Sequence, residues 1–153
     1  MKEKFFSVII PNYNNSTYLE KCLKSVLNQT FTNYELIVID DVSTDNSVEI
    51  VKNIFNEYKD KDTKLIELKE KAWNGGSRNI GIKQATGKYF LFLDSDDWFI
   101  NNTIFQQVYD FIISKNNPEL IRLSFDILTK DNWQFTVWLD EKDLDELANT
   151  CYV

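Results

Sequence analysis

The chain has 153 residues, of which 43% are hydrophobic, and a formal net charge of -7. This length and composition suit a globular domain and exclude a disordered chain. The acidic balance repels phosphate backbones, and the lysines are scattered among acids, so we expect no nucleic-acid partner. The sequence contains no histidine, which excludes serine–histidine, cysteine–histidine and histidine–zinc chemistries from this chain.

Two features of the sequence bear on its cellular location. Cys22 and Cys151 lie far apart in the sequence, and we expect both to be reduced, as in a cytoplasmic protein. The apolar run after the charged N-terminus is too short for a signal peptide, and no stretch reaches transmembrane length. We therefore expect a cytoplasmic protein, with peripheral association at the inner face of a membrane left open.

Short apolar runs alternate with helical patterns along the chain. This alternation predicts right-handed β–α–β units and a mostly parallel sheet, and runs that are apolar throughout indicate a sheet covered on both faces. The expected fold class is therefore α/β, an open Rossmann-like sheet with helices on both faces. In chain order, the expected strands are residues 5–10, 34–39, 64–68, 89–93, 120–128 and 133–139.

The first two helices are predicted from the residues that begin them. Thr17 and Glu20 have the spacing of a capping box, and an apolar stripe follows them at helical spacing. Thr44 and Asp45 are side chains that can cap the second helix.

The third helix is expected to follow a glycine-containing turn, Asn74-Gly75-Gly76-Ser77. Gly87 is the residue type that commonly follows a helix end, so we expect this helix to end near it. Two more helices are expected, one from Asn102 or Thr103 to a point before Pro118 and one over residues 140–149.

Polar residues follow three of the predicted strands, where ligands bind in open α/β sheets. Clustered carboxylates repel one another, and a divalent cation removes that cost. Aspartate oxygens are ligands for Mn²⁺ or Mg²⁺, which are commonly held by one or two carboxylates together with substrate phosphates. A phosphate-bearing ligand is therefore expected, with Arg78 as its opposing charge. The three polar runs are Pro11-Asn12-Tyr13-Asn14-Asn15, Asp40-Asp41-Val42-Ser43 and Asp94-Ser95-Asp96-Asp97.

Each of these signals also has a structural interpretation. Asp40-Asp41 is equally consistent with a turn or a helix cap, the Asn-Gly-Gly run with an ordinary turn, and Tyr13 with packing. Core packing is the default expectation for the four tryptophans, Trp73, Trp98, Trp133 and Trp138. The functional interpretation rests on the coincidence of these signals at one edge of one sheet.

Over about residues 5–100 the chain closely resembles family 2 glycosyltransferases, which have the GT-A fold. No single motif carries the resemblance, but the ordered set is specific. The matching segments are residues 8–14, 27–31, 35–45, 74–81 and 87–97, and they include Ile10-Pro11-Asn12-Tyr13, Ile39-Asp40-Asp41, Ser77-Arg78-Asn79 and Leu93-Asp94-Ser95-Asp96-Asp97.

The resemblance implies roles for the residues at the first two strand ends. Pro11 and Tyr13 would line the nucleotide base pocket, with Tyr13 against the base. Asp41 would accept a hydrogen bond from the base, expected to be uracil, and Asp40 would support Asp41. Val42 stands where the family usually has glycine, a departure expected to affect loop geometry alone.

The resemblance also implies a phosphate and metal site. Arg78 would contact the nucleotide or its phosphates. Asp94-Ser95-Asp96 matches the family's Asp-x-Asp motif, so Asp96 would bind the metal, Asp94 would face the ribose or the metal, and Asp97 could assist. The cofactor expected is Mn²⁺ or Mg²⁺.

The implied reaction is the inverting transfer of a sugar from a nucleotide diphosphate donor, expected to be a UDP-sugar, to a hydroxyl of a saccharide or lipid-linked acceptor. Residues 1–100 would form the nucleotide-sugar-binding core, and residues 101–153 would begin an acceptor-side region. The catalytic base that the family carries further along is not recognisable after residue 100. Because the chain ends early for this family, we expect it to be the N-terminal part of a longer protein.

Three alternatives remain open at the level of sequence. A nucleotidyltransferase would want a glycine-rich, basic loop after the first strand, and residues 11–15 have neither property. A receiver-like signalling module would use acids at strand ends with a later lysine, for which Lys130 is available, but gives Arg78 no role. A non-catalytic module that binds nucleotide-sugar and metal is the third alternative.

Overall fold

The computed structural model describes residues 3–116, and the part up to residue 107 contains a parallel sheet with helices packed against it. The described residues fall into two compact units, one up to Gln107 and one from Val108. The expected strands at 120–128 and 133–139 and the last expected helix lie outside the described residues. The elements are β1 Phe6–Asn12, α1 Ser16–Leu27, β2 Tyr34–Asp40, α2 Ser47–Glu57, β3 Thr63–Glu67, α3 Trp73–Gln84, β4 Tyr89–Phe92 and α4 Ile104–Ser114.

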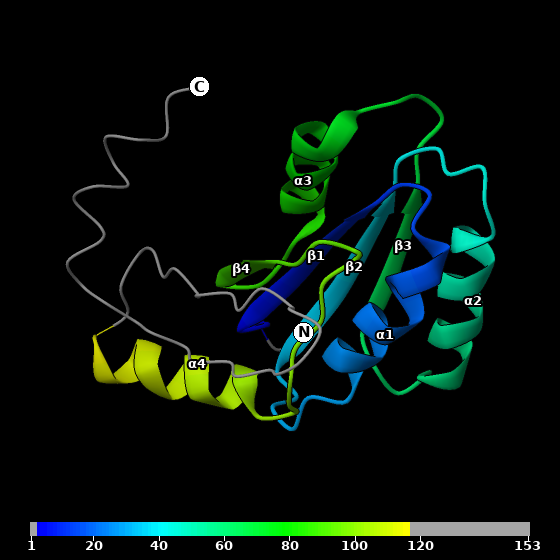
Figure 1. The fold of residues 1–153 in the computed structure, drawn as a ribbon. Helices are drawn as coiled ribbons and strands as arrows, with labels where there is room; N and C mark the ends of the chain where they lie inside the picture. The colour runs from blue at the N-terminus through cyan, green and yellow to red at the C-terminus, as the bar shows by residue number, and fades with distance from the viewer. Residues whose placement is uncertain (1–2, 117–153) are drawn as a thin grey trace, which may run out of the picture. The chain divides into compact units, whose positions relative to one another are not determined.

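The sheet has the order β3-β2-β1-β4, with every neighbouring pair parallel. α1 and α2 lie side by side, and α3 lies on the other side of the sheet (Figure 1). Because successive side chains of a strand point to opposite faces, Ile9 and Ile39 face α3 while Val8 and Ile10 face away, and all four are fully buried. The α/β fold with helices on both faces, expected from sequence, is thereby confirmed.

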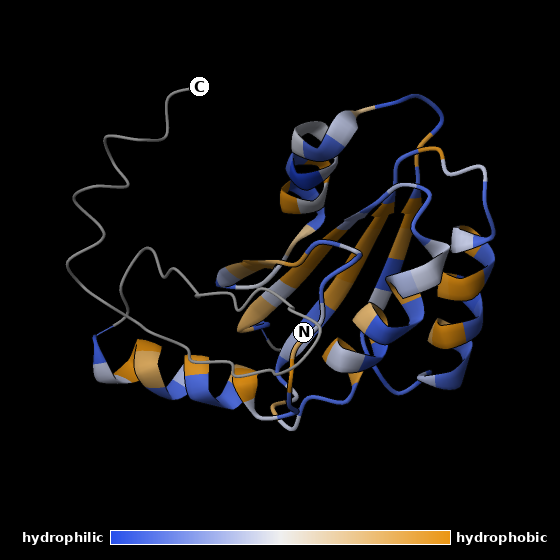
Figure 2. Cartoon of the chain, in the orientation of Figure 1, coloured by the Kyte–Doolittle hydropathy of each residue, from blue (hydrophilic) through white to orange (hydrophobic). Residues whose placement is uncertain are grey.

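The expectation of complete burial is wrong for β4. Phe90 and Phe92 are 42% and 44% exposed, because β4 is an edge strand of the sheet in the part of the chain that is described. The central strands β1 and β2 are buried at every position, which Figure 2 shows as the orange centre of the sheet. Only the central strands β1 and β2 are fully buried among the four described strands. The hydrophobicity of a run did not predict whether its strand lies at the centre or at the edge of the sheet.

The sequence suggested that the first strand ends before Pro11. In the structure β1 instead continues to Asn12, in register with Asp40. The carbonyl groups show why proline is tolerated here. Ile9 O accepts from Leu93 N on the β4 side, whereas Asn12 O accepts from Asp41 N on the β2 side. Backbone groups alternate in direction along a strand, so the missing N–H of Pro11 points to the β4 side, where pairing stops at Ile9.

The predicted capping box of α1 is wrong. The helix begins at Ser16 with Asn15 as N-cap and no side-chain cap, and Glu20 instead forms an ion pair with Lys24 at 2.7 Å. The N–H of Ser16 is bound by a carboxylate distant in sequence, Asp45 Oδ2, at 3.0 Å. The start of α1 is therefore bound by Asp45, which lies in another loop, and not by the predicted pair Thr17 and Glu20.

Asp45 binds the start of two helices. Its Oδ1 accepts from Ser47 N, at the first residue of α2, at 3.0 Å, while its Oδ2 accepts from Ser16 N at the first residue of α1. Desolvation opposes ionisation of Asp45, but the hydrogen bonds from Ser47 and Ser16 outweigh it and lower its pKa to about 2. Of the two residues expected to cap α2, Asp45 is the one that binds the first helical N–H.

The glycine-containing turn before the third helix is also placed differently. Residues 74–77 lie inside the first turns of α3, which begins at Trp73 and ends at Gln84 rather than near Gly87. Gly87 serves packing instead: a Cβ there would stand 2.6 Å from the backbone of Phe6 and Ser7. Its N–H donates to Ser7 Oγ at 2.8 Å, so the chain passes too close to β1 for any larger residue.

Within residues 3–116, no helix combines the length and the apolar character needed to cross a bilayer.

Two glycines of α3 provide a matched test of the packing between this helix and the sheet. A methyl group on Gly81 would overlap the side chains of Ile9 and Ile39, whereas one on Gly75 would meet nothing within 4 Å. We expect Gly81→Ala to lower the free energy of unfolding by about 1–3 kcal/mol through overpacking. Gly75→Ala should raise it by roughly 0.5–1 kcal/mol because alanine favours a helix. Urea denaturation measures both, and equal effects would contradict this packing.

Asp45→Ala tests the shared cap. We expect the free energy of unfolding to fall by about 1 kcal/mol at neutral pH, the usual cost of losing a cap. Because folding lowers the pKa of Asp45 from 3.8 to about 2, its contribution is complete above 3.8 and is lost as the pH falls towards 2. Urea denaturation of the wild type and of Asp45→Ala should show that the difference in their free energies of unfolding shrinks as the pH is lowered from 3.8 to 2. Glu70→Ala, at an exposed acid, is the control and should change stability by less than about 0.5 kcal/mol.

Candidate active site

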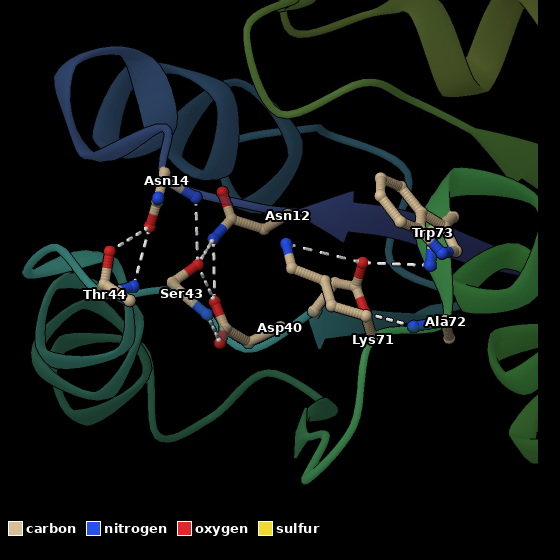
Figure 3. Close-up of polar contacts among 9 residues, drawn as sticks. Asn12, Asn14, Asp40, Ser43, Thr44, Lys71, Ala72 and Trp73 are labelled. Atoms are coloured by element: carbon tan, nitrogen blue, oxygen red, sulfur yellow. Dashed lines mark hydrogen bonds and ion pairs between the residues drawn. The ribbon is translucent and has the colours of Figure 1, made fainter.

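The loops after β1 and β2 are joined through Asp40, the last residue of β2. Its side chain is buried, and it accepts hydrogen bonds from Asn12 Nδ2 at 2.9 Å, Ser43 N at 2.9 Å and Ser43 Oγ at 2.6 Å (Figure 3). Ser43 Oγ in turn accepts from Asn12 Nδ2 at 3.2 Å and from Asn14 N at 3.0 Å. Asp40 therefore holds two loops together.

Two residues of these loops have left-handed backbone conformations. Asn14 has φ 50° and Val42 has φ 61°. Asparagine tolerates this region, and Asn14 Oδ1 also accepts from Thr44 N at 2.7 Å. For β-branched Val42 the conformation is strained, with a cost of about 1–3 kcal/mol. The loop thus keeps a backbone shape that suits glycine although the sequence has valine there.

Asp41 binds the start of α3. Its side chain is buried, with Oδ1 accepting from Ala72 N at 2.7 Å and Oδ2 from Trp73 N at 3.0 Å. A negative group at this position also interacts favourably with the helix dipole. The helix-cap interpretation of Asp41 is therefore correct. A carboxylate has about four acceptor positions, so Asp41 can accept further hydrogen bonds from a ligand beyond these two.

Two residues that the sequence missed or misjudged, Lys71 and Trp73, lie beside Asp41. The Nζ of Lys71 lies over the ring of Tyr13, 4.0 Å from Asp41 Oδ2 and 5.9 Å from the ring centroid of Trp73. Core packing, the default for Trp73, is wrong: its side chain is 73% exposed and its φ is 60°. Tyr13 is 47% exposed. Lys71 carried no signal because an isolated lysine in an acidic loop looks like solvated surface.

The acidic loop after β4 contacts both α3 and α1. Arg78, on α3, forms an ion pair with Asp94 Oδ1. On the other side, Asn15 Nδ2 donates to Ser95 Oγ at 3.0 Å, and Cys22 Sγ donates to Asp94 O at 3.5 Å. Ser95 is 7% exposed, so it anchors the loop while Asp94 remains half exposed.

The carboxylates of this loop are close enough to perturb one another. Desolvation and the charges of Asp96 and Asp94 raise the pKa of Asp97. Burial, followed by the charges of the same three acids, raises the pKa of the Cys22 thiol. Among residues 3–116, no three acidic or cysteine side chains form a metal cage by themselves. The repelling oxygens suit a hard divalent cation, provided that another molecule supplies further oxygen ligands.

The residues predicted for the site thus fall into two groups connected by α3. Asp41 binds its first N–H groups, and Arg78, further along the same helix, pairs with Asp94. Pro11 is buried within β1 and pairs with Ile39, beneath the loops. The sequence did not identify Asn12 and Ser43 as organisers, since their role depends on pairing between strands.

The chain is similar to known proteins over most of its length. The family model described as "Glycosyl transferase family 2" matches residues 7–119. An uncharacterized glycosyltransferase of Haemophilus influenzae is 44% identical over 108 residues, which are 71% of this chain and 42% of that protein. The Escherichia coli UDP-Glc:alpha-D-GlcNAc-diphosphoundecaprenol beta-1,3-glucosyltransferase WfgD is 33% identical over 132 residues, 86% of this chain and 50% of that protein.

The chain is also similar to a solved glycosyltransferase structure. The chain matches Staphylococcus aureus TarS 1-349 in complex with UDP-GlcNAc at 36% identity and a TM-score of 0.67, over 73% of this chain and 32% of that chain. The chain thus spans half or less of the length of each of these proteins. The matched family region covers most of the sequence, from within β1 to beyond α4. The chain therefore belongs to the family 2 glycosyltransferases and has their GT-A fold.

Proposed function

We propose that this protein binds a UDP-sugar and transfers the sugar, with inversion, to an acceptor hydroxyl. The observation that carries the proposal is the bridge made by α3, whose start is held by Asp41 and whose Arg78 pairs with Asp94. This bridge gives one ligand access to a buried carboxylate, a guanidinium and an acidic loop. The similarity to TarS, solved in complex with UDP-GlcNAc, supports the choice of donor.

The nucleobase is assigned to the end of β1 and β2. The half-exposed ring of Tyr13 is a face on which a planar base can stack. Asp41 retains acceptor capacity for the base N–H beyond its two backbone bonds. Asp40 keeps both loops in register, and Pro11 supports them from within the sheet.

The diphosphate is assigned to Arg78 and the acidic loop. The guanidinium of Arg78 can exchange its ion pair with Asp94 for phosphate oxygens, which it binds in a planar, bidentate manner. Asp96 and Asp94 are the residues proposed to hold Mn²⁺ or Mg²⁺ together with those oxygens. When bound, such a cation stabilises negative charge on the departing diphosphate.

The acceptor is proposed to be a saccharide or lipid-linked hydroxyl. WfgD, by its name, acts on a sugar linked to diphosphoundecaprenol, which supports this class. Inversion requires a base that takes the acceptor proton, and no residue of 3–116 is assigned to that role. The expected cytoplasmic location, at the inner face of a membrane, stays a prediction.

Calorimetric titration with UDP and UDP-sugars, with and without Mn²⁺, tests donor binding. We expect UDP binding that strengthens with the cation and weakens about tenfold or more in Asp96→Asn, because a cation ligand is lost. Asp60→Asn is the matched control, since it makes the same chemical change at an exposed acid elsewhere, and it should bind UDP like the wild type. Tight binding of ATP without preference for UDP would favour a nucleotidyltransferase, and no nucleotide binding would contradict the proposal.

Two half-exposed tyrosines test the base subsite. Tyr13 and Tyr18 are 47% and 49% exposed, so either change to leucine should leave stability within about 0.5 kcal/mol. Tyr13→Leu should weaken UDP binding by roughly 5- to 100-fold, the usual effect of losing base stacking. Tyr18→Leu should leave UDP binding unchanged. Equal affinities of the two variants for UDP would show that Tyr13 is not part of the base subsite.

A donor-binding module without catalysis is the second candidate. It is the function that remains if residues 3–116 bind the donor and supply no base for the acceptor. Hydrolysis of a UDP-sugar by this chain, followed as UDP release, separates the two candidates. Release that requires Asp96 supports catalysis, whereas UDP binding without any release supports the module.

A further inference from the structure

Lys71 lies in the loop between β3 and α3 and contacts both residues assigned to the nucleobase. Its Nζ lies over the ring of Tyr13, and the same atom is 4.0 Å from Asp41 Oδ2. The Lys71 side chain is 32% exposed, and that of Asp41 is 7% exposed. One ammonium group thus contacts an aromatic face and a buried carboxylate at once.

The backbone around Lys71 is held in place by the same carboxylate. Asp41 accepts from the N–H groups of the next two residues, Ala72 at 2.7 Å and Trp73 at 3.0 Å. Trp73 has φ 60°, a conformation that bulky residues rarely adopt and that persists only where surrounding contacts impose it. Lys71, Ala72 and Trp73, which Figure 3 labels, all contact the carboxylate of Asp41. The position of Lys71 is therefore imposed by contacts rather than by the freedom of an exposed loop.

The position of Lys71 conflicts with a stacked base. A base stacks on a ring at van der Waals distance, and the ammonium of Lys71 already covers the ring of Tyr13. We propose that Lys71 occupies the nucleobase subsite of the unliganded protein and is displaced when the base binds, so that this residue sets the affinity for the nucleotide. This inference rests on the proposed function, because it takes Tyr13 and Asp41 as the base-binding residues.

The size of the effect follows from the contacts that the base has to replace. Lys71 gives up a partly exposed cation–π contact and a partly exposed ion pair, each of which is weak. Together they correspond to roughly a 3- to 30-fold reduction in affinity. Removal of the Lys71 side chain should therefore tighten binding, whereas removal of an ordinary phosphate-binding lysine would weaken it.

The binding experiment compares Lys71→Ala with Lys69→Ala in the whole chain. Lys69 is an exposed lysine of the same loop, so both variants remove one positive charge from one segment. We expect Lys71→Ala to bind UDP about 3- to 30-fold more tightly than the wild type, and Lys69→Ala to bind like the wild type. Unchanged or weaker binding by Lys71→Ala, with wild-type binding intact, would overturn the inference.

A second measurement starts from the ligand-free protein and uses NMR. The Hε protons of Lys71, assigned by comparison with the Lys71→Ala spectrum, should resonate upfield of the usual lysine Hε position in ligand-free protein because of the Tyr13 ring current. The upfield shift should vanish in Tyr13→Leu and when wild-type protein is saturated with UDP. Ordinary Hε shifts in protein that binds UDP would overturn this inference alone. An upfield shift with no UDP binding by any variant would contradict the proposed function, and the inference would fall with it.

Discussion

The contact between Asp41 and the first N–H groups of α3 underlies the geometry of the whole site. It joins the carboxyl end of β2 to a helix that follows β3, and that helix carries Arg78 to the acidic loop after β4. A buried carboxylate with charge-assisted bonds to two backbone donors is a strong and directional anchor. Loss of this anchor would free Lys71, Trp73 and Arg78 together, because all three depend on where α3 begins.

The site is also where the backbone is strained. Val42 and Trp73 both have positive φ angles, and each lies next to Asp41 in sequence or through its hydrogen bonds. Such conformations persist only if the surrounding bonds determine them. Here the bonds of Asp40 to Asn12 and Ser43 hold one loop, and those of Asp41 hold the other. The acids thus shape the loops before any ligand arrives, and this shaping explains why two adjacent carboxylates are buried at a strand end.

In the ligand-free protein, two carboxylates of the candidate site are paired with basic side chains of the same chain. Arg78 pairs with Asp94, and Lys71 lies near Asp41. In a chain of net charge -7, these pairs reduce repulsion at an edge that also carries Asp96 and Asp97. Under the proposed function, phosphate oxygens would replace Asp94 on Arg78, and the nucleobase would replace Lys71 on the ring of Tyr13. Affinity then depends on the difference between two sets of contacts.

The sequence by itself determined the order of strands and helices up to α4 and the fold class, because apolar runs and helical stripes are local patterns. It also predicted that the acids after β2 and β4 lie at one edge, because parallel strands bring their carboxyl ends together. The ligand-binding roles of these acids and of Arg78 stay predictions. Only the tertiary structure decided which partner each polar group takes. Asp45 replaced the predicted capping box, Gly87 served packing against β1 rather than a helix end, and Trp73 stayed exposed. These outcomes, and the position of Lys71 over Tyr13, depend on contacts between segments about 30 or more residues apart, which no local pattern contains.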